Sequence, residues 1–363
     1  MKGLYVHIPF CEHICFYCDF AKRVPKDQHM IDEYLSHLFD EINVYEKHFD
    51  SIETIYIGGG TPSMLNLEQT ERLLNYLNRM KPSEYTIEVN PESYTKEKGL
   101  LYKNFGINRI SLGVQTFNQD ILNSLNRKHS NQQVYDTINH LRELGIPNIN
   151  LDLIYALPNQ TLYDLENDLD HIKNINPTHI SAYSLILEEK TVFYHEYLKG
   201  NFKVMDEDLE AIMYQKIMDT LTMFGYEHYE ISNFSKQGFQ SKHNLIYWSM
   251  GEYIGVGVGA HGFIDGYRTQ NQRSLNQYYA NPQIDKVFQS DELKLQDELI
   301  FGLRKLEGIH VPTLEGRYQI KLNERYPKLK DKIDQGLVKY ENDYLKLTEK
   351  GVFLGNQVFM VFI

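Results

Sequence analysis

Three cysteines lie close together near the start of this chain, and the sequence contains no others. Cys11, Cys15 and Cys18 have the spacing C-x3-C-x2-C and follow the segment Tyr5-Val-His-Ile-Pro-Phe. Three clustered thiolates can hold three corners of an iron–sulfur cube and leave the fourth iron without a protein ligand. An open iron of this kind can bind a substrate or a cofactor, whereas a fully ligated cluster only passes electrons.

Zinc is the alternative metal for these thiolates. Structural zinc sites use four protein ligands, commonly as two separated pairs. The cysteines here form one group without a second pair, so a zinc site would need His7 or His13 to complete it. Three adjacent cysteines also make a poor disulfide framework, which favours a reducing compartment.

The bulk composition is that of a globular protein. The 363 residues are 42% hydrophobic and 24% charged, enough for one large domain and a smaller one. The formal net charge of −12 disfavours binding to nucleic acid. The first residues run directly into a predicted strand without a signal peptide, and no apolar run approaches the ~20 residues that span a bilayer. We therefore expect a cytoplasmic protein without an integral membrane segment. A peripheral membrane location stays open.

Short apolar strands alternate with amphipathic helices in the first half. The predicted strands cover residues 4–8, 54–57, 85–89, 109–114, 148–154 and 179–185. The predicted helices cover residues 30–47, 67–80, 96–105, 131–144, 162–175 and 208–224. This alternation predicts an α/β fold with about six βα units and a parallel sheet, fewer units than the eight of a closed barrel. Periodicity alone does not separate an open barrel from a doubly wound sheet.

The remainder of the chain has a different character. Residues 236–289 are rich in glycine and aromatics and lack a helical period. After them we expect helices over 293–305, 312–318 and 326–334, then a hairpin over 337–347 that turns at Asn342-Asp343. Helices followed by a hairpin are typical of a winged-helix-like module, here a lid or docking domain. The predicted division is 1–235, 236–289 and 290–363.

The cysteine pattern, with aromatic Tyr17 before the last thiol, resembles the signature of the radical S-adenosylmethionine (SAM) superfamily. The glycine run Gly58-Gly59-Gly60-Thr61-Pro62 after the second strand is similar to that family's glycine motif. The resemblance implies a partial (β/α)6 radical-SAM barrel that holds a [4Fe–4S] cluster on the three cysteines. SAM would chelate the open iron and be cleaved to methionine and a 5′-deoxyadenosyl radical.

Within that superfamily the chain resembles the coproporphyrinogen III dehydrogenase-like group over nearly its whole length. The matching segments are residues 5–11, 58–62, 87–91, 109–117, 126–127 and 150–155. The resemblance implies a set of SAM-contacting or cluster-contacting residues: Tyr5, Tyr17, Gly59, Gly60, Thr61, Glu88, Gln115, Arg127 and Asp152. Each of the last four also has a plainer role, as a strand-end turn residue, a loop hydrogen bond or a surface ion pair.

Two features distinguish the branches of this group. The dehydrogenase has a further cysteine two residues after the third, where this chain has Phe20, and it has an N-terminal extension before its first strand. The motif His243-Asn-Leu-Ile-Tyr247-Trp248 resembles that of the heme chaperones and implies that these three residues contact heme. Alternatively, His243 caps a turn and Trp248 packs in the core, with His261 as a competing heme ligand.

The resemblance favours a heme chaperone that binds a [4Fe–4S] cluster, SAM and heme and delivers heme to acceptor hemoproteins. It allows a homodimer and leaves open whether SAM is cleaved productively. The alternative is oxygen-independent coproporphyrinogen III dehydrogenase, which would oxidatively decarboxylate two porphyrin propionates. A radical SAM methyltransferase is a weaker third hypothesis.

Overall fold

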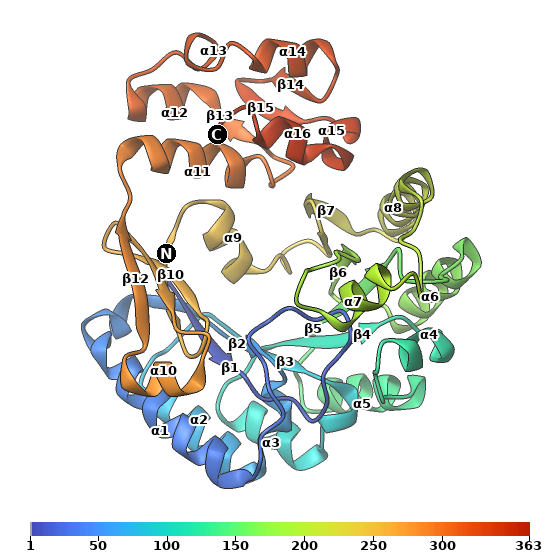
Figure 1. The fold of residues 1–363 in the computed structure, drawn as a ribbon, viewed down its shortest axis with the longest axis vertical. Helices are drawn as coiled ribbons and strands as arrows, with labels where there is room; N and C mark the ends of the chain where they lie inside the picture. The colour runs from blue at the N-terminus through green and yellow to red at the C-terminus, as the bar shows by residue number, and fades with distance from the viewer. Residues whose placement is uncertain (1) are drawn as a thin grey trace.

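One sheet of twelve strands runs through most of the molecule, and six of its strands form an open barrel (Figure 1). The computed structural model describes residues 2–363, with Ile284 described by its backbone alone. The barrel strands pair in parallel and in chain order: β1 (Lys2–Ile8), β2 (Ile52–Gly59), β3 (Glu84–Val89), β4 (Arg109–Gln115), β5 (Asn148–Tyr155) and β6 (His179–Ser184). This arrangement confirms the predicted partial (β/α)6 barrel.

Helices cover the outer face of these strands (Figure 1). They are α1 (Gln28–Val44), α2 (Leu67–Leu77), α3 (Lys96–Asn104), α5 (Asn131–Glu143), α6 (Leu162–Ile175) and α8 (Glu207–Met223). Two short helices, α4 (Gln119–Ser124) and α7 (Val192–Leu198), pack instead with Phe16 and Tyr17, which lie between Cys15 and Cys18. Because both faces of the strands are covered, β4 is buried along its whole length. The short helices α4 and α7 were not predicted, since so few residues show no clear period.

The helix starts are defined by side-chain caps. Three of the helices begin with a capping box, in which the N-cap side chain and the third helical residue satisfy each other's backbone N–H groups. The cap residues are Asn66 before α2, Ser130 before α5 and Thr161 before α6. These signals place each helix start just after the turn that follows a strand.

Residues 236–289 extend the sheet at the β1 edge. They form α9 (Lys242–Trp248), β9 (Glu252–Val256), β10 (His261–Ile264), β11 (Tyr267–Asn271), α10 (Leu275–Ala280) and β12 (Gln283–Phe288). Strand β9 pairs in parallel with β1, and β10, β11 and β12 follow in antiparallel order. At the other edge β6 pairs with β8 (Asn233–Ser235), which pairs with β7 (Glu227–Glu230). With β9 and β8 at its two edges, the barrel does not close on itself.

The C-terminal part packs helices on a small antiparallel sheet. Its elements are α11 (Asp291–Gly302), β13 (Ile309–His310), α12 (Val311–Tyr318), α13 (Leu322–Arg325), α14 (Leu329–Asp334), β14 (Val338–Glu341), β15 (Tyr344–Leu347), α15 (Glu349–Phe353) and α16 (Gly355–Phe359). The predicted hairpin is confirmed, with positive φ at Asn342 and Asp343 as a two-residue turn requires.

The helix predicted over 326–334 begins later than expected. Tyr326 adopts φ −125° and ψ 71°, because the residue before a proline is pushed out of the helical region, and α14 starts only at Leu329. Helix α11 lies against α9, so the C-terminal part contacts the barrel near the edge strands (Figure 1). None of the helices within residues 2–363 is long and apolar enough to cross a membrane.

Candidate cofactor site and adjoining aromatic pocket

Two adjoining cavities border the barrel strands, and the first lies at their carboxyl ends, where βα folds place their chemistry. The first, here the cluster cavity, has a volume of about 340 Å³ and contains the three cysteines. The second, here the aromatic pocket, has a volume of about 580 Å³ and lies between the β1–β2 edge, α9 and β9–β11. Four residues line both cavities: Asp19, Phe20, Tyr56 and Glu88.

The cysteine loop after β1 is held by a hydrogen bond within itself and by two from the end of α4. The Cys11 N–H donates to the carbonyl of Arg23 at 3.0 Å, which folds the loop back on itself. The Asn126 side-chain amide donates to the carbonyl of Ile14 at 2.8 Å, and Leu125 accepts from the Phe16 N–H at 3.2 Å. The end of α4 therefore sets the position of the loop, which explains the place of Asn126 in the motif set.

The side chains of this loop fit a [4Fe–4S] cluster. Cys11, Cys15 and Cys18 are free thiols that line one cavity. Within residues 2–363, no three His, Cys, Asp or Glu side chains converge on a position that could hold a single metal ion. A cube instead spreads its three thiolates over three irons. Burial raises the pKa of Cys11 to about 12, and a thiolate there needs a nearby cation such as iron.

The glycine motif brings the end of β2 against the cysteine loop. A Cβ on Gly60 would lie 2.7 Å from the Phe10 carbonyl oxygen and 2.8 Å from Cys11 Sγ. Gly59 has φ 120°, a conformation open to glycine, and its N–H donates to Glu88 Oε2 at 3.0 Å. The Gly60 N–H donates to the carbonyl of Ile8 at the end of β1, and the Thr61 N–H donates to the carbonyl of Phe10, each at 2.8 Å. A bound amine would therefore meet the carbonyl oxygens of this turn.

Two partly buried carboxylates, Glu88 and Asp152, face the cluster cavity. Glu88 accepts from the Tyr56 hydroxyl at 2.9 Å as well as from Gly59. Asp152 accepts from the Ser111 hydroxyl at 2.9 Å and from the Asn150 amide at 2.8 Å. Burial, with the neighbouring Asp152, raises the pKa of Glu88 to about 7, and burial also raises the pKa of Asp152. A cationic ligand would favour the ionised form of both carboxylates. SAM carries two such cationic groups, a sulfonium and an ammonium.

Arg127 and Gln115 complete the far wall of the cluster cavity. Arg127 is buried, donates to the Gly113 carbonyl at 2.6 Å and reaches Cys15 Sγ at 4.0 Å. Burial alone would raise the pKa of Glu92. A hydrogen bond with His129 and the charge of Arg127 outweigh burial and hold this pKa at about 2. Gln115 ends β4 with φ 68°, in the left-handed region that a non-glycine residue seldom adopts. Strain of this kind gathers at functional sites.

The structure brings the predicted cluster and SAM residues together with one exception. All three cysteines, Tyr17, Gly59, Gly60, Thr61, Glu88, Gln115, Arg127 and Asp152 line the cluster cavity. Tyr5 lines the aromatic pocket instead, where its hydroxyl lies 2.9 Å from His7 Nδ1. The ligand that each residue contacts stays a prediction.

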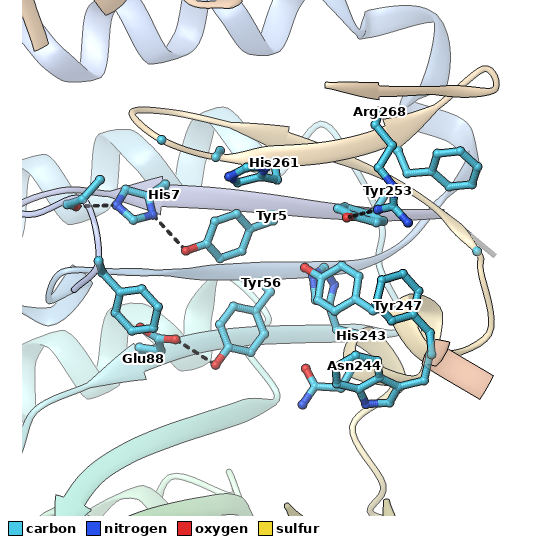
Figure 2. A pocket seen from close by; sticks show the side chains of 18 of the residues that line it. Tyr5, His7, Tyr56, Glu88, His243, Asn244, Tyr247, Tyr253, His261 and Arg268 are labelled. Atoms are coloured by element: carbon cyan, nitrogen blue, oxygen red, sulfur yellow. Dashed lines mark hydrogen bonds between the residues drawn. The ribbon is translucent and has the colours of Figure 1, made fainter. Parts of the chain in front are cut away.

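The three predicted heme residues lie in the aromatic pocket, on helix α9 (Figure 2). Ser241 caps this helix, and Glu84 accepts the N–H groups of Lys242 and His243 at 3.0 and 2.9 Å. His243 is buried, with Nδ1 2.8 Å from the Thr54 hydroxyl and Nε2 2.6 Å from the Tyr247 hydroxyl. Burial lowers the pKa of His243 to about 3, which keeps its ring neutral.

Trp248 forms the outer part of the same wall. The Arg304 guanidinium stacks 4.5 Å above its ring, and Phe301 of α11 lies 6.1 Å away between ring centroids. Phe301 also lines the pocket, so the C-terminal part closes one side of it. Whether this part acts as a lid or as a docking domain stays a prediction.

Several lining residues were not predicted from the sequence. Tyr56 lies on β2, two residues before Gly58, and its place in the strand just before the glycine motif could have indicated it. Tyr253, Phe263, Arg268 and Arg273 come from the segment without a helical period, where the sequence carried no signal.

Comparisons with known proteins agree with this geometry. A model of the radical SAM superfamily matches residues 5–172, and one of the HemN C-terminal domain matches residues 290–354. The structure of coproporphyrinogen III oxidase (HemN) from Escherichia coli superposes with a TM-score of 0.86 at 26% identity, over 99% of this chain and 89% of that chain.

Sequence relatives cover the chain from end to end. The heme chaperone HemW of Bacillus subtilis is 41% identical over 100% of this chain and 99% of that protein. HemW of Lactococcus lactis is 40% identical over 100% and 97%, and HemW of Escherichia coli is 33% identical over 99% and 98%. The chain therefore belongs to the radical SAM superfamily and, within it, to the family of the heme chaperone HemW.

Proposed function

We propose that this chain binds heme in the aromatic pocket and delivers it to acceptor hemoproteins. The observation that carries the proposal is a pocket of about 580 Å³ that holds the His243, Tyr247 and Trp248 motif. Cavities of about 300–1,000 Å³ with aromatic walls suit flat ligands of this size. The end-to-end similarity to HemW proteins supports the same cargo.

The cluster cavity serves the resident cofactors in this proposal. Cys11, Cys15 and Cys18 would hold the [4Fe–4S] cluster, and the backbone at Gly59–Thr61 would accept the SAM amino group. Glu88 and Asp152 would balance the positive charge of SAM, and Arg127 would sit beside the cluster. When bound, the cluster and SAM supply one-electron chemistry. The shared wall at Tyr56 and Glu88 would place both cofactors next to the heme pocket.

The second candidate function is that of coproporphyrinogen III dehydrogenase. The superposition on the Escherichia coli HemN structure favours it. Phe20 weighs against it, because an exposed phenylalanine that lines both cavities stands where the dehydrogenase pattern has a further cysteine.

One anaerobic experiment separates the two functions. The cluster is reconstituted, SAM is added with either coproporphyrinogen III or heme, and CO2 release, 5′-deoxyadenosine and retained heme are measured. The chaperone predicts stable heme binding and transfer to an apo-hemoprotein such as apomyoglobin, without porphyrin turnover. Stoichiometric CO2 release with protoporphyrinogen formation would contradict it and establish the dehydrogenase.

We further propose that the chain works in the cytoplasm, where its thiols stay reduced. A homodimer is compatible with this function, and sizing of the protein with and without its cluster tests it. A cluster-dependent change of mass would support a dimer, and the same monomer mass in both states would contradict it.

A further inference from the structure

The aromatic pocket contains three histidines, which differ in whether their ring nitrogens already make hydrogen bonds. His7 lies 2.7 Å from the Ala21 carbonyl through Nε2 and bonds Tyr5 through Nδ1. His243 uses both nitrogens as well, on Thr54 and Tyr247. Both rings are almost fully buried. Ligation of iron by either one would break a buried hydrogen bond, at a cost of about 1–3 kcal/mol.

His261 is the histidine that remains available. It is exposed and lines the pocket from the first position of β10 (Figure 2). Within residues 2–363 neither of its ring nitrogens makes a hydrogen bond or an ion pair.

The glycine run before His261 places it there. A Cβ on Gly255 would lie 1.9 Å from the His261 carbonyl oxygen, and one on Gly262 would lie 2.5 Å from Thr269 Oγ1. Gly257 and Gly259 adopt φ 97° and 72°. Only glycine lets β10 fold back this closely on β9. These glycines therefore allow the tight fold-back that places the His261 imidazole at the pocket wall.

Two arginines line the same pocket, and their charges are compensated differently. Arg268 is paired with Asp297 at 2.6 Å and bonds the Tyr253 hydroxyl. Arg273 is exposed and donates to the Asp19 carbonyl oxygen at 2.7 Å, without a carboxylate partner among the described residues. Its guanidinium keeps further donors, in a geometry that suits a carboxylate. Heme carries two propionate carboxylates.

We propose that His261 is the axial ligand of the heme iron in this pocket and that Arg273 binds a heme propionate. The inference rests on the proposed heme-binding function and assigns its ligands. His243 is then a positioning residue, because it connects α9 to β2 through Thr54 and orients Tyr247. An exposed histidine with free nitrogens can also bind iron without breaking a hydrogen bond of the fold.

The test is a titration of the full-length protein with ferric heme, followed by its Soret spectrum, the resonance Raman iron–imidazole mode of the ferrous form and the heme retained on a sizing column. His261→Ala should lose the imidazole signature and weaken heme binding about tenfold, and added imidazole should restore the spectrum. Arg273→Gln should weaken binding about fivefold with an unchanged spectrum.

His243→Gln serves as the comparison variant. It should keep the imidazole signature even where displacement of α9 lowers the affinity. A His261→Ala protein with the wild-type spectrum and affinity, or loss of the signature in His243→Gln alone, would overturn the ligand assignment and leave heme binding intact. A wild-type chain that retains no heme would overturn the proposed function itself.

Discussion

The two cavities share a wall but are built differently. In the cluster cavity the polar side chains are held by the protein: Glu88 by Tyr56 and Gly59, and Asp152 by Ser111 and Asn150. In the aromatic pocket, His261 has free ring nitrogens, and Arg273 is not paired with a carboxylate among residues 2–363. A preorganised cavity suits a cofactor that stays, and a pocket with open ligands suits a cargo that must be exchanged.

The largest effect is expected from removing one cysteine thiolate, which should affect the cluster cavity and leave the aromatic pocket unchanged. Cys11→Ala should abolish assembly of a complete [4Fe–4S] cluster, because only three cysteines are present. Iron and sulfide analysis after anaerobic reconstitution measures this. The same variant should bind heme with wild-type affinity, since Cys11 does not line the aromatic pocket. A full cluster in this variant would refute the assignment of the thiolates.

Gly60→Ala should damage the cluster cavity through packing. Its new Cβ would lie under 3.0 Å from Phe10 and Cys11, so the loop must shift, at a cost of about 1–3 kcal/mol in the free energy of unfolding. Urea unfolding and cluster content measure the effect. Gly316→Ala is the matched control, because a Cβ there meets nothing within 4 Å. Equal stability of the two variants would contradict the close approach of Gly60 to Phe10 and Cys11.

Acid should destabilise the folded chain through His243, which lies in the wall of the aromatic pocket. His243 has a pKa of about 3 in the folded chain, against 6.5 for an ordinary histidine, so the unfolded chain binds the proton first. The free energy of unfolding that the neutral His243 ring contributes is fully present above pH 6.5. It is lost as the pH falls, by about 2 kcal/mol at about pH 5.

Urea titrations of the cluster-free protein from about pH 7.5 to about pH 5 measure that loss. His243→Gln should show a shallower decline than wild type, whereas replacement of exposed His29 by Gln should leave the slope unchanged. Parallel curves for wild type and His243→Gln would show that His243 is not buried as a neutral ring.

The smallest expected effect concerns charge at the cluster cavity. Asp152→Asn keeps the shape but removes a carboxylate, and should weaken SAM binding about tenfold, or ~1.4 kcal/mol. Heme affinity should not change, because Asp152 lines only the cluster cavity. Calorimetric titration with each ligand measures both. Weaker heme binding with unchanged SAM binding would contradict the assignment of SAM to the cluster cavity and of heme to the aromatic pocket.

The two cavities also differ in how far the sequence predicted them. The cluster cavity comes from short motifs that each lie in the carboxyl half of one strand or just after it, so strand order alone brings Cys11, Gly60, Glu88 and Asp152 together. The aromatic pocket depends on β9 pairing with β1 and on β10 folding back over it. Pairing between strands this far apart in the chain leaves no local period, so Arg273 could not be predicted and the availability of His261 could not be inferred.

The central claim is that heme occupies the aromatic pocket and not the cluster cavity. Asn244→Trp tests it most directly, because Asn244 lines this pocket from α9, and a large side chain there should fill it. Lys242→Trp, on the same helix but outside the pocket, is the control. Heme titration should show loss of binding in Asn244→Trp alone, with wild-type cluster content in both proteins. Full heme binding by Asn244→Trp would contradict the account.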